Sequence, residues 1–332
     1  MAAFSCALKQ NPPTSSYRNM GIKHHQACLR HLQCSLGDRT RSQPDAVLGA
    51  IILLITLDCI TGDSSAWRTH VRGGRKWLQT ARSKLWKGTD SMSTLYQIFS
   101  VLEAIGGAAH GLEDFGGDLA SDYTYDSILG VCGTTLHQNY RLDSLYGLTQ
   151  PILEAIIHIN KLDARPMTAT SQEVENLRIK ILLNDPRGLC LDDVVDSTER
   201  ELVRHHACVF YFACQIHYER TIHRVTPEST QDLVTRALEH LEAIAGLEIH
   251  LNVAGLMWPV FVTACEAESD SIRKRFHWYF GKGQKHGIQG ISAGQKVVQE
   301  VWRRRDACSA PDKASIRWQQ VMVDLRLDLL LT

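Results

Sequence analysis

The chain has 332 residues, 44% of them hydrophobic, and its 36 basic and 36 acidic residues give a formal net charge of zero. A chain of this length buries roughly three quarters of its unfolded surface, so a folded globular protein is expected. The zero net charge argues against a protein that wraps nucleic acid, because phosphate neutralisation needs a basic excess. No basic cluster flanks an amphipathic apolar face that would bind a membrane surface.

The first third of the chain carries helix signals. Residues 1–10 lack a basic segment followed by an apolar one, so no secretory signal is predicted. The longest apolar run, Ala46 to Leu57, falls short of the ~20 residues of a membrane-spanning helix and predicts a buried helix. The polar segment Asp63–Ser65 is suited to cap a helix that carries Trp67 and His70. A later stripe at helical spacing consists of Leu95, Ile98, Phe99, Leu102 and Ile105.

Helix signals continue to the C-terminus. Pro151 is suited to the first turn of a helix, and Ser171 is suited to be an N-cap. The segment Thr226-Pro227-Glu228 predicts another helix start, with a capping residue, a first-turn proline and an acid near the helix N-terminus. The longest pattern runs roughly from Ser197 to His223. The supporting apolar stripes are Ile152, Ala155, Ile156, Ile159 and Leu162; Val203, Ala207, Phe210, Tyr211, Cys214 and Tyr218; Leu233, Ala237, Leu241 and Ile244; and Val297, Val298, Val301 and Trp302.

Strand signals are poor throughout. No run alternates strictly between apolar and polar residues, and Pro259 interrupts the β-branched stretch Val253–Thr263. The sequence therefore predicts an all-α fold, a single large domain of roughly a dozen helices. The least ordered segments are expected at Asn11–Ser16, Leu162–Thr170 and Gly281–Ser292.

Ten cysteines are spread along the chain and form no Cys-x-x-Cys pair. So long a chain is not a small disulfide scaffold, and reduced, mostly buried thiols in an intracellular protein are expected. His24, Cys28 and His31 share one face of a predicted helix, which would need a fourth ligand from elsewhere to bind zinc. Because no paired ligand motif accompanies them, a polar helix face is preferred and no metal is predicted; the segment His205–Cys208 is weaker still.

Three short segments resemble functional motifs, and each has a simpler explanation. Gly62-Asp63-Ser64 lacks the Gly-x-Ser-x-Gly elbow of a hydrolase and reads as a helix cap, so no catalytic residue is predicted. Gly281–Gly287 lacks the ending of a P-loop, and a flexible loop is expected. Arg303–Arg305, beside Asp306, is interpreted as a solvated helix face; a nuclear import signal is an alternative without a second basic cluster. No Lys/Arg-rich recognition helix is predicted.

Three segments carry a family pattern. In the first, Leu48–Leu78, an apolar helix leads to a Gly-Asp turn, a Trp, a His and a small-residue step. The second is Leu145–Thr149 with the long helix through Tyr211. The third joins a Trp-Pro pair and Cys-Glu-Ala to a distal Val-Trp-Arg-Arg-Arg-Asp and the Trp318 segment. The signature residues are Gly62, Trp67, His70, Gly73, Trp258, Pro259, Cys265, Glu266, Ala267, Trp302 and Asp306.

This pattern resembles the fungal-specific transcription factor domain, from about Tyr17 to the C-terminus. The resemblance implies a helical regulatory domain over residues 17–332 after a short tail or remnant over 1–16. In that family the domain accompanies a DNA-reading binuclear zinc cluster, which needs two Cys-x-x-Cys pairs. The sequence holds neither pair, so specific DNA binding and a zinc cofactor are expected only if an upstream segment supplies the cluster.

The resemblance further implies a non-enzymatic regulator of RNA polymerase II transcription in the nucleus. It implies a protein partner or a small-molecule effector and allows a homodimer. The signature residues are assigned to core packing in preference to ligand contact. Trp67, Trp258 and Trp302 are expected to be buried anchors, and Gly73 and Gly74 to allow close helix approach or a bend. Pro259 would start or kink a helix, and Glu266 would pair with a helix-end amide or a basic residue.

Three alternatives stay open. A helical ligand-binding module acting without DNA would show an apolar cavity with a few convergent polar groups. An enzyme on a helical scaffold would show a strongly perturbed acid–base pair in a pocket. A truncated relative without function would be recognised from genomic sequence upstream of Met1.

Overall fold

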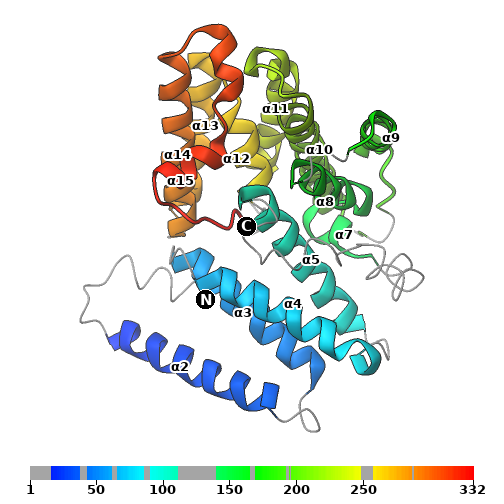
Figure 1. Cartoon of the computed structure of the whole chain (residues 1–332), viewed down its shortest axis with the longest axis vertical. Helices are drawn as coiled ribbons and strands as arrows, with labels where there is room; N and C mark the ends of the chain where they lie inside the picture. The colour runs from blue at the N-terminus through cyan, green and yellow to red at the C-terminus, as the bar shows by residue number, and fades with distance from the viewer. Residues whose placement is uncertain are drawn as a thin grey trace.

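The computed structural model describes residues 16–37, 43–61, 66–85, 90–110, 140–164, 169–191, 194, 196–247, 257–285 and 288–332. Within these ranges the chain is helical and has no β-strand, which confirms the predicted all-α fold (Figure 1). The α-helices are α2 (Ser16–Gly37), α3 (Pro44–Thr61), α4 (Ala66–Leu85), α5 (Asp90–His110), α7 (Leu142–Tyr146), α8 (Gln150–Ala164), α9 (Ser171–Leu183), α10 (Ser197–Tyr218), α11 (Gln231–Leu247), α12 (Met257–Cys265), α13 (Asp270–Gln284), α14 (Gln289–Asp306) and α15 (Trp318–Asp324). Short turns are η3 (Pro186–Gly188), η4 (Glu219–His223), η5 (Pro227–Thr230) and η6 (Ala310–Ser315).

The N-terminal helices form a layer below the rest of the molecule in Figure 1. α3 packs on α4 and α5, and α2 lies outside α3. α5 leaves this layer to pack on α8, so it connects the two parts of the structure. A Cβ atom at Gly74 would lie 2.7 Å from the Phe99 ring of α5, so the absent side chain permits the contact. Gly73 has nothing within 4 Å of such an atom, so the predicted close approach applies to Gly74 alone.

α10 is the central helix of the larger part and packs on α7, α8, α11 and α12. Its N-cap, Asp196, accepts hydrogen bonds from the backbone N–H groups of Thr198 and Glu199. The predicted apolar stripes of α8 and α10 are buried, which confirms the periodicity argument. α10 passes into η4, a π-helical turn, and the chain leaves that turn through Arg224 at φ 52°.

The C-terminal segment returns to the N-terminal layer. The Trp67 indole N–H donates to the backbone carbonyl of Asp328 at 3.1 Å, and Arg68 forms an ion pair with the Asp328 carboxylate. Leu329, Leu330 and Leu331 are buried. Residues about 260 positions apart in the sequence are therefore in direct contact, and α4 of the N-terminal layer packs together with the C-terminal segment.

Two predicted helix starts are wrong in detail. The N-cap of α9 is Thr170, whose hydroxyl accepts from the Glu173 N–H at 3.1 Å; Ser171 is the first helical residue. The one-residue shift arises because Thr170, with an acid three residues later, is the better capping pair. Thr226 precedes η5, which leads into α11, and makes no side-chain cap hydrogen bond. The predicted cap at Asp63–Ser65 lies outside the described residues.

The segments predicted to be least ordered are partly helical. α13 extends to Gln284 and α14 begins at Gln289, so most described residues of Gly281–Ser292 are in helices, contrary to the prediction. α8 likewise continues to Ala164. Residues 11–15, 165–168 and 286–287 of these segments lie outside the described residues. Among the helices described, none is long and apolar enough to cross a membrane.

Candidate functional site

The most unusual feature of the core is a buried cluster of charges. Glu266, directly after α12, is 3% exposed and lies between two guanidinium groups. Its Oε2 is 2.9 Å from Nε of Arg220 in η4, and its Oε1 is 3.0 Å from a terminal nitrogen of Arg305 in α14. Arg220 and Arg305 are 8% and 0% exposed. Two cations thus share one buried carboxylate, so of the two partners predicted for Glu266, a helix-end amide or a basic residue, the structure shows the basic one.

Backbone carbonyl groups complete the cluster. The carbonyl of Ile316 accepts from both Arg220, at 3.2 Å, and Arg305, at 3.1 Å. Arg305 also donates to the carbonyl of Cys265 at 2.6 Å, and Arg220 donates to the carbonyl of Val225. The cluster therefore connects the segment between η6 and α15 to η4, to the end of α12 and to α14. Burial lowers the pKa of Arg220, Arg305 lowers it further, and Glu266 opposes the shift.

Arg305 corrects the prediction that Arg303–Arg305 forms a solvated face. Arg303 and Arg304 do pair near the surface with Glu300, whose pKa their hydrogen bonds lower to about 2. Arg305 instead follows Val301 by four positions, so it lies on the buried stripe of α14. The same spacing could have found it from the sequence. Asp306 is half exposed and pairs with both terminal nitrogens of Arg273, at 2.7 and 2.9 Å.

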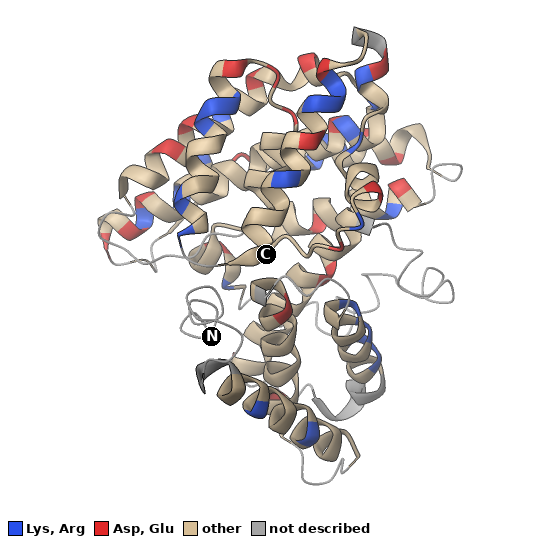
Figure 2. Ribbon diagram, turned by 90° about the vertical axis from the view of Figure 1, so that its left-hand side faces the viewer, with Lys and Arg blue, Asp and Glu red and all other residues tan. Residues whose placement is uncertain are grey.

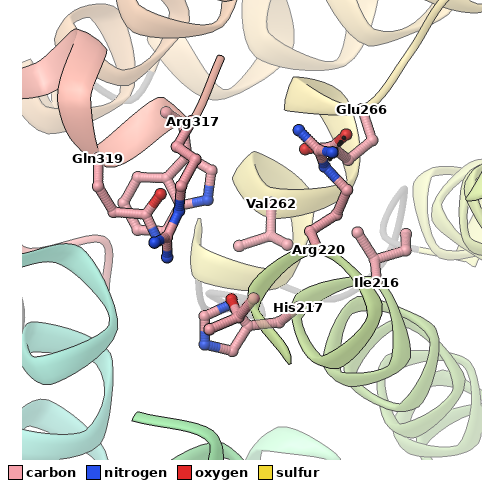
Figure 3. A pocket seen from close by; sticks show the side chains of 9 residues that line it. Ile216, His217, Arg220, Val262, Glu266, Arg317 and Gln319 are labelled. Carbon is pink, nitrogen blue, oxygen red and sulfur yellow. Dashed lines mark hydrogen bonds and ion pairs between the residues drawn. The ribbon is translucent and has the colours of Figure 1, made fainter. Parts of the chain in front are cut away.

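A small pocket opens beside this cluster, where η4 and the ends of α10 and α12 meet the C-terminal segment. Figure 3 shows Arg317 and Gln319 on one side and Val262 and Arg220 on the other. The space inside it that a water-sized body can occupy is about 10 Å³, which is room for about one water molecule. The lining residues are Ile216, His217, Arg220, Thr221, Val262, Glu266, Arg317, Trp318 and Gln319.

A neutral histidine forms the floor of the pocket. His217 is 3% exposed, and burial lowers its pKa to about 4, so it is uncharged at neutral pH. Its Nε2 lies 3.1 Å from Oδ1 of Asn160, and its Nδ1 lies 3.3 Å from the Thr221 hydroxyl. Asn160 donates to the carbonyl of Ala104 in α5 at 2.8 Å. The Asn160 amide oxygen is thus the acceptor for His217 Nε2–H, and Nδ1 accepts from Thr221.

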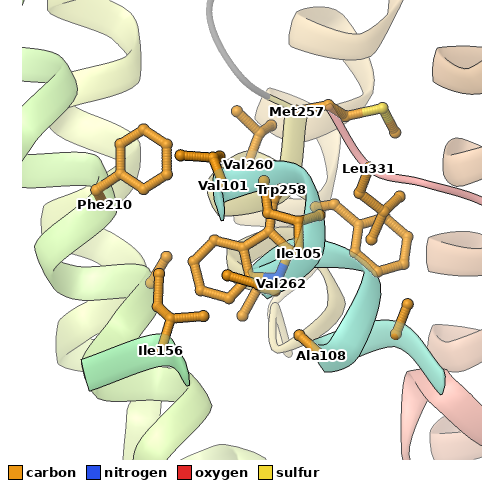
Figure 4. Close-up of a cluster of buried hydrophobic side chains, with 14 of the residues drawn as sticks. Val101, Ile105, Ala108, Ile156, Phe210, Met257, Trp258, Val260, Val262 and Leu331 are labelled. Atoms are coloured by element: carbon orange, nitrogen blue, oxygen red, sulfur yellow. The ribbon is translucent and has the colours of Figure 1, made fainter. Parts of the chain in front are cut away.

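Three signature tryptophans are buried. Trp67, Trp258 and Trp302 are 1%, 0% and 6% exposed. Figure 4 places Trp258 in the centre of an apolar cluster with Ile105 of α5 and Val262 of α12. Its indole lies 6.4 Å from the Phe210 ring, and its N–H finds no acceptor among the described residues. By contrast, the Trp302 N–H donates to the Ala264 carbonyl at 2.8 Å.

The other signature residues lie in several environments. Pro259 is buried in the first turn of α12, where a missing N–H costs little, and Cys265 and Ala267 are fully buried. His70 is half buried, with its Nε2 3.6 Å from the Asp58 carboxylate. Gly73 is exposed on α4. Gly62 lies outside the described residues.

The candidate metal ligands do not converge. His24, Cys28 and His31 lie on α2 as predicted, at exposed or half-buried positions. His205 Nδ1 lies 2.8 Å from His240 Nδ1 of α11, so it pairs across helices and not with Cys208. Across the described ranges, no three His, Cys, Asp or Glu residues are grouped to hold a metal ion.

The cysteine prediction holds only in part. None of the eight described cysteines forms a disulfide, yet only three are buried: Cys208, Cys214 and Cys265. The prediction of mostly buried thiols is therefore wrong for the described positions, because cysteines outside the apolar stripes lie at or near the surface.

A sequence model of the fungal specific transcription factor domain matches residues 1–332. The chain belongs to this family. The buried residues of the Trp-Pro, Cys-Glu-Ala and Val-Trp-Arg-Arg-Arg-Asp segments thus form the charged cluster and its apolar surroundings in a fungal-specific transcription factor domain.

Two relatives carry descriptive names. The acriflavine sensitivity control protein acr-2 of Neurospora crassa is 23% identical over 324 residues, which cover 88% of this chain and 52% of that protein. The arginine metabolism regulation protein II of Saccharomyces cerevisiae is 26% identical over 140 residues, covering 42% of this chain and 15% of that protein. The chain thus spans about half or less of these relatives. No solved structure matches it.

Proposed function

We propose that this chain is a non-enzymatic regulatory domain that acts on transcription in the nucleus. The observation that carries the proposal is the family match over residues 1–332, supported by relatives named as control and regulation proteins. The domain acts through a protein partner or a small effector, and a homodimer is compatible with it. The proposal includes no metal cofactor for this chain, because no paired ligand motif accompanies the histidines and cysteines of α2.

The distribution of charge supports a regulatory domain that does not itself read DNA. The N-terminal helices, and α4 in particular, are the exception to this mixed distribution. In Figure 2, basic and acidic residues alternate along the upper helices, whereas the lower, N-terminal helices show mainly basic ones. α4 has six Lys or Arg residues and no Asp or Glu, so it is a basic helix, although no Lys/Arg-rich recognition helix for DNA was predicted. Arg68 and Arg75 of α4 are, however, held by Asp328 and Glu103 within the fold.

The regulatory function is tested by tethering. The chain fused to a heterologous DNA-binding domain is expected to change reporter transcription severalfold in a fungal cell, relative to that DNA-binding domain alone. A fusion carrying Trp258→Ala is expected to lose the effect, because it removes a central core side chain. Trp278→Ala, at a 55% exposed position, is the matched control and should keep the effect. An unchanged reporter with a stable fusion would refute the proposal.

The prediction that this chain alone does not bind DNA sequence-specifically is tested with the purified protein. Fluorescence anisotropy of the purified chain at physiological salt is expected to show no preference for genomic fragments over scrambled DNA. Any weak binding through α4 is expected to disappear as salt rises, because it depends on phosphate neutralisation. Lys76→Gln, at an exposed position of α4, should reduce such binding for all sequences equally. Sequence-selective binding in the nanomolar range would contradict the prediction.

A further inference from the structure

Positive charge is concentrated in the first part of the chain. Residues 1–85 contain 12 Lys or Arg and 4 Asp or Glu, whereas residues 86–332 contain 24 Lys or Arg and 32 Asp or Glu. The formal net charge of zero is therefore the sum of a basic N-terminal part and an acidic remainder. Neither α2 nor α4 contains an Asp or a Glu, and the basic residues of the lower helices stand out in Figure 2. Such an asymmetry favours an anionic partner for the N-terminal layer.

The outer side of α2 is open. α2 packs on α3 and lies on the outside of the N-terminal layer (Figure 1). On its open side Ile22 and Leu36 are 44% and 39% exposed, and Leu29 between them is half-buried. Lys23 and Arg30 are exposed beside this apolar row. Because residues seven positions apart lie close to one line along a helix, the outer side presents an apolar row next to a basic row.

This arrangement matches the way in which one helix packs along another. In a pair of helices, apolar residues repeat every seven positions, and the charged residues that flank them select the partner. Ile22, Leu29 and Leu36 follow that repeat over about 21 Å of α2. A partner helix on this row would remove Ile22 and Leu36 from water, and the neighbouring cations would favour acidic residues on it.

Other occupants fit this surface less well. A second copy that placed its α2 on this one would oppose two basic rows, and like charges facing each other are unfavourable. A second copy that offered its acidic part instead would make a head-to-tail contact, which stays open-ended unless the rotation closes a ring. A DNA backbone would neutralise Lys23 and Arg30 but leave the apolar row in water. The surface thus favours a helix that carries both acidic and apolar residues.

We propose that the outer face of α2 docks an acidic amphipathic helix of a partner protein. The apolar row of Ile22, Leu29 and Leu36 covers the apolar side of that helix. Lys23 and Arg30 pair with its acidic residues. This inference rests on the proposed regulatory function, because it names the class of protein through which the domain acts.

A synthetic helix tests the docking face. The probe consists of three repeats of Ile-Ala-Ala-Leu-Glu-Gln-Glu, in which glutamates flank the apolar positions and oppose self-pairing. Fluorescence anisotropy with the full chain is expected to show saturable binding of this acidic peptide. A lysine peptide, with Lys in place of every Glu, and a scrambled peptide of unchanged composition are expected to bind at least about tenfold more weakly.

Reversing the charge of the face is expected to reverse its preference. The double variant Lys23→Glu, Arg30→Glu should bind the lysine peptide more tightly than the acidic one, a result that misfolding could not produce. The matched control is Lys274→Glu, Lys296→Glu, which reverses two exposed lysines of α13 and α14. This control should keep the preference of the wild type.

Removing the apolar row tests the other half of the face. The double variant Ile22→Ser, Leu36→Ser is expected to weaken binding of the acidic peptide at least about tenfold. Leu183→Ser, at a 79% exposed position of α9, is the matched control and should leave the affinity unchanged. The melting temperature of each variant shows whether it is folded.

Several results would overturn the inference. They are no binding of the acidic peptide by the folded chain, equal affinity for the acidic, lysine and scrambled peptides, or an unchanged preference in Lys23→Glu, Arg30→Glu. Tighter binding of duplex DNA in competition with the peptide would assign the face to a phosphate backbone instead. Self-association of the chain that Ile22→Ser, Leu36→Ser abolishes would assign it to a second copy.

The tethered reporter is read separately from peptide binding. An active reporter without peptide binding refutes the docking face alone. An inactive reporter with peptide binding refutes the regulatory function alone.

Discussion

Replacing Glu266 by glutamine is expected to lower the free energy of unfolding by about 3–5 kcal/mol, the usual cost of removing one partner of a buried ion pair. The substitution leaves Arg220 and Arg305, 8% and 0% exposed, without their shared counter-charge. Because the entropy of unfolding scales with chain length, the melting temperature should fall by roughly 4–7 °C. Chemical denaturation and thermal melting both measure the change.

Glu300→Gln is a matched control for Glu266→Gln. Glu300 also bridges two arginines, Arg303 and Arg304, but near the surface of α14. Its loss is expected to cost about 0–1 kcal/mol, because water screens exposed pairs. A triple variant with Arg220→Met, Glu266→Leu and Arg305→Met removes all three charges and is expected to recover much of the lost stability. Equal destabilisation by Glu266→Gln and Glu300→Gln would show that burial does not control the cost.

Truncating Trp258 to alanine is expected to cost about 3–5 kcal/mol of unfolding free energy, through lost burial and a cavity. The side chain is 0% exposed and stands where α5, α10 and α12 meet (Figure 4). Trp258→Phe is expected to cost less, because the ring still fills part of the site and the unpaired indole N–H is removed.

The control for this prediction is Trp278→Ala in α13. Trp278 is 55% exposed, and the Lys282 ammonium lies 4.8 Å from the centre of its ring. Its truncation is expected to change the unfolding free energy by less than about 1 kcal/mol. Denaturant titrations of the three variants give the ranking directly. A melting temperature unchanged by Trp258→Ala would mean that this tryptophan does not support the core.

Helix positions could be predicted well because their signal is local. The apolar spacing that predicted a helix over Ser197–His223 agrees with α10 followed by η4, and the stripe of Val297, Val298, Val301 and Trp302 is buried in α14. A 3.6-residue period needs no knowledge of the partner surface. Helix ends were harder to predict. The N-cap of α9 is Thr170 and not the predicted Ser171, because the cap is the residue whose hydroxyl accepts a hydrogen bond from a backbone N–H of the first turn.

The candidate site was predicted only in part. Glu266 was singled out, with a helix-end amide or a basic residue as its predicted partner, but the sequence did not identify Arg220 and Arg305, which lie 46 and 39 positions away. Arg305 belongs to a run of three arginines that was interpreted as a solvated helix face. Only its alignment with the apolar stripe of α14 distinguishes it from Arg303 and Arg304. Arg317 and Gln319 carried no signal, because they stand at the start of the short helix α15 and belong to none of the apolar stripes used for prediction.

The all-α class, the helices with strong periodicity, the burial of Trp67, Trp258 and Trp302, and the likeness to a transcription factor family could all be predicted from the amino-acid sequence. Three features appear only after folding: which charges are buried together, the return of the C-terminal segment to Trp67, and the small pocket beside the charged cluster. They join residues that are far apart along the chain. Helix formation depends on residues three or four positions apart, whereas ion pairing and pocket formation depend on which helix faces meet after folding.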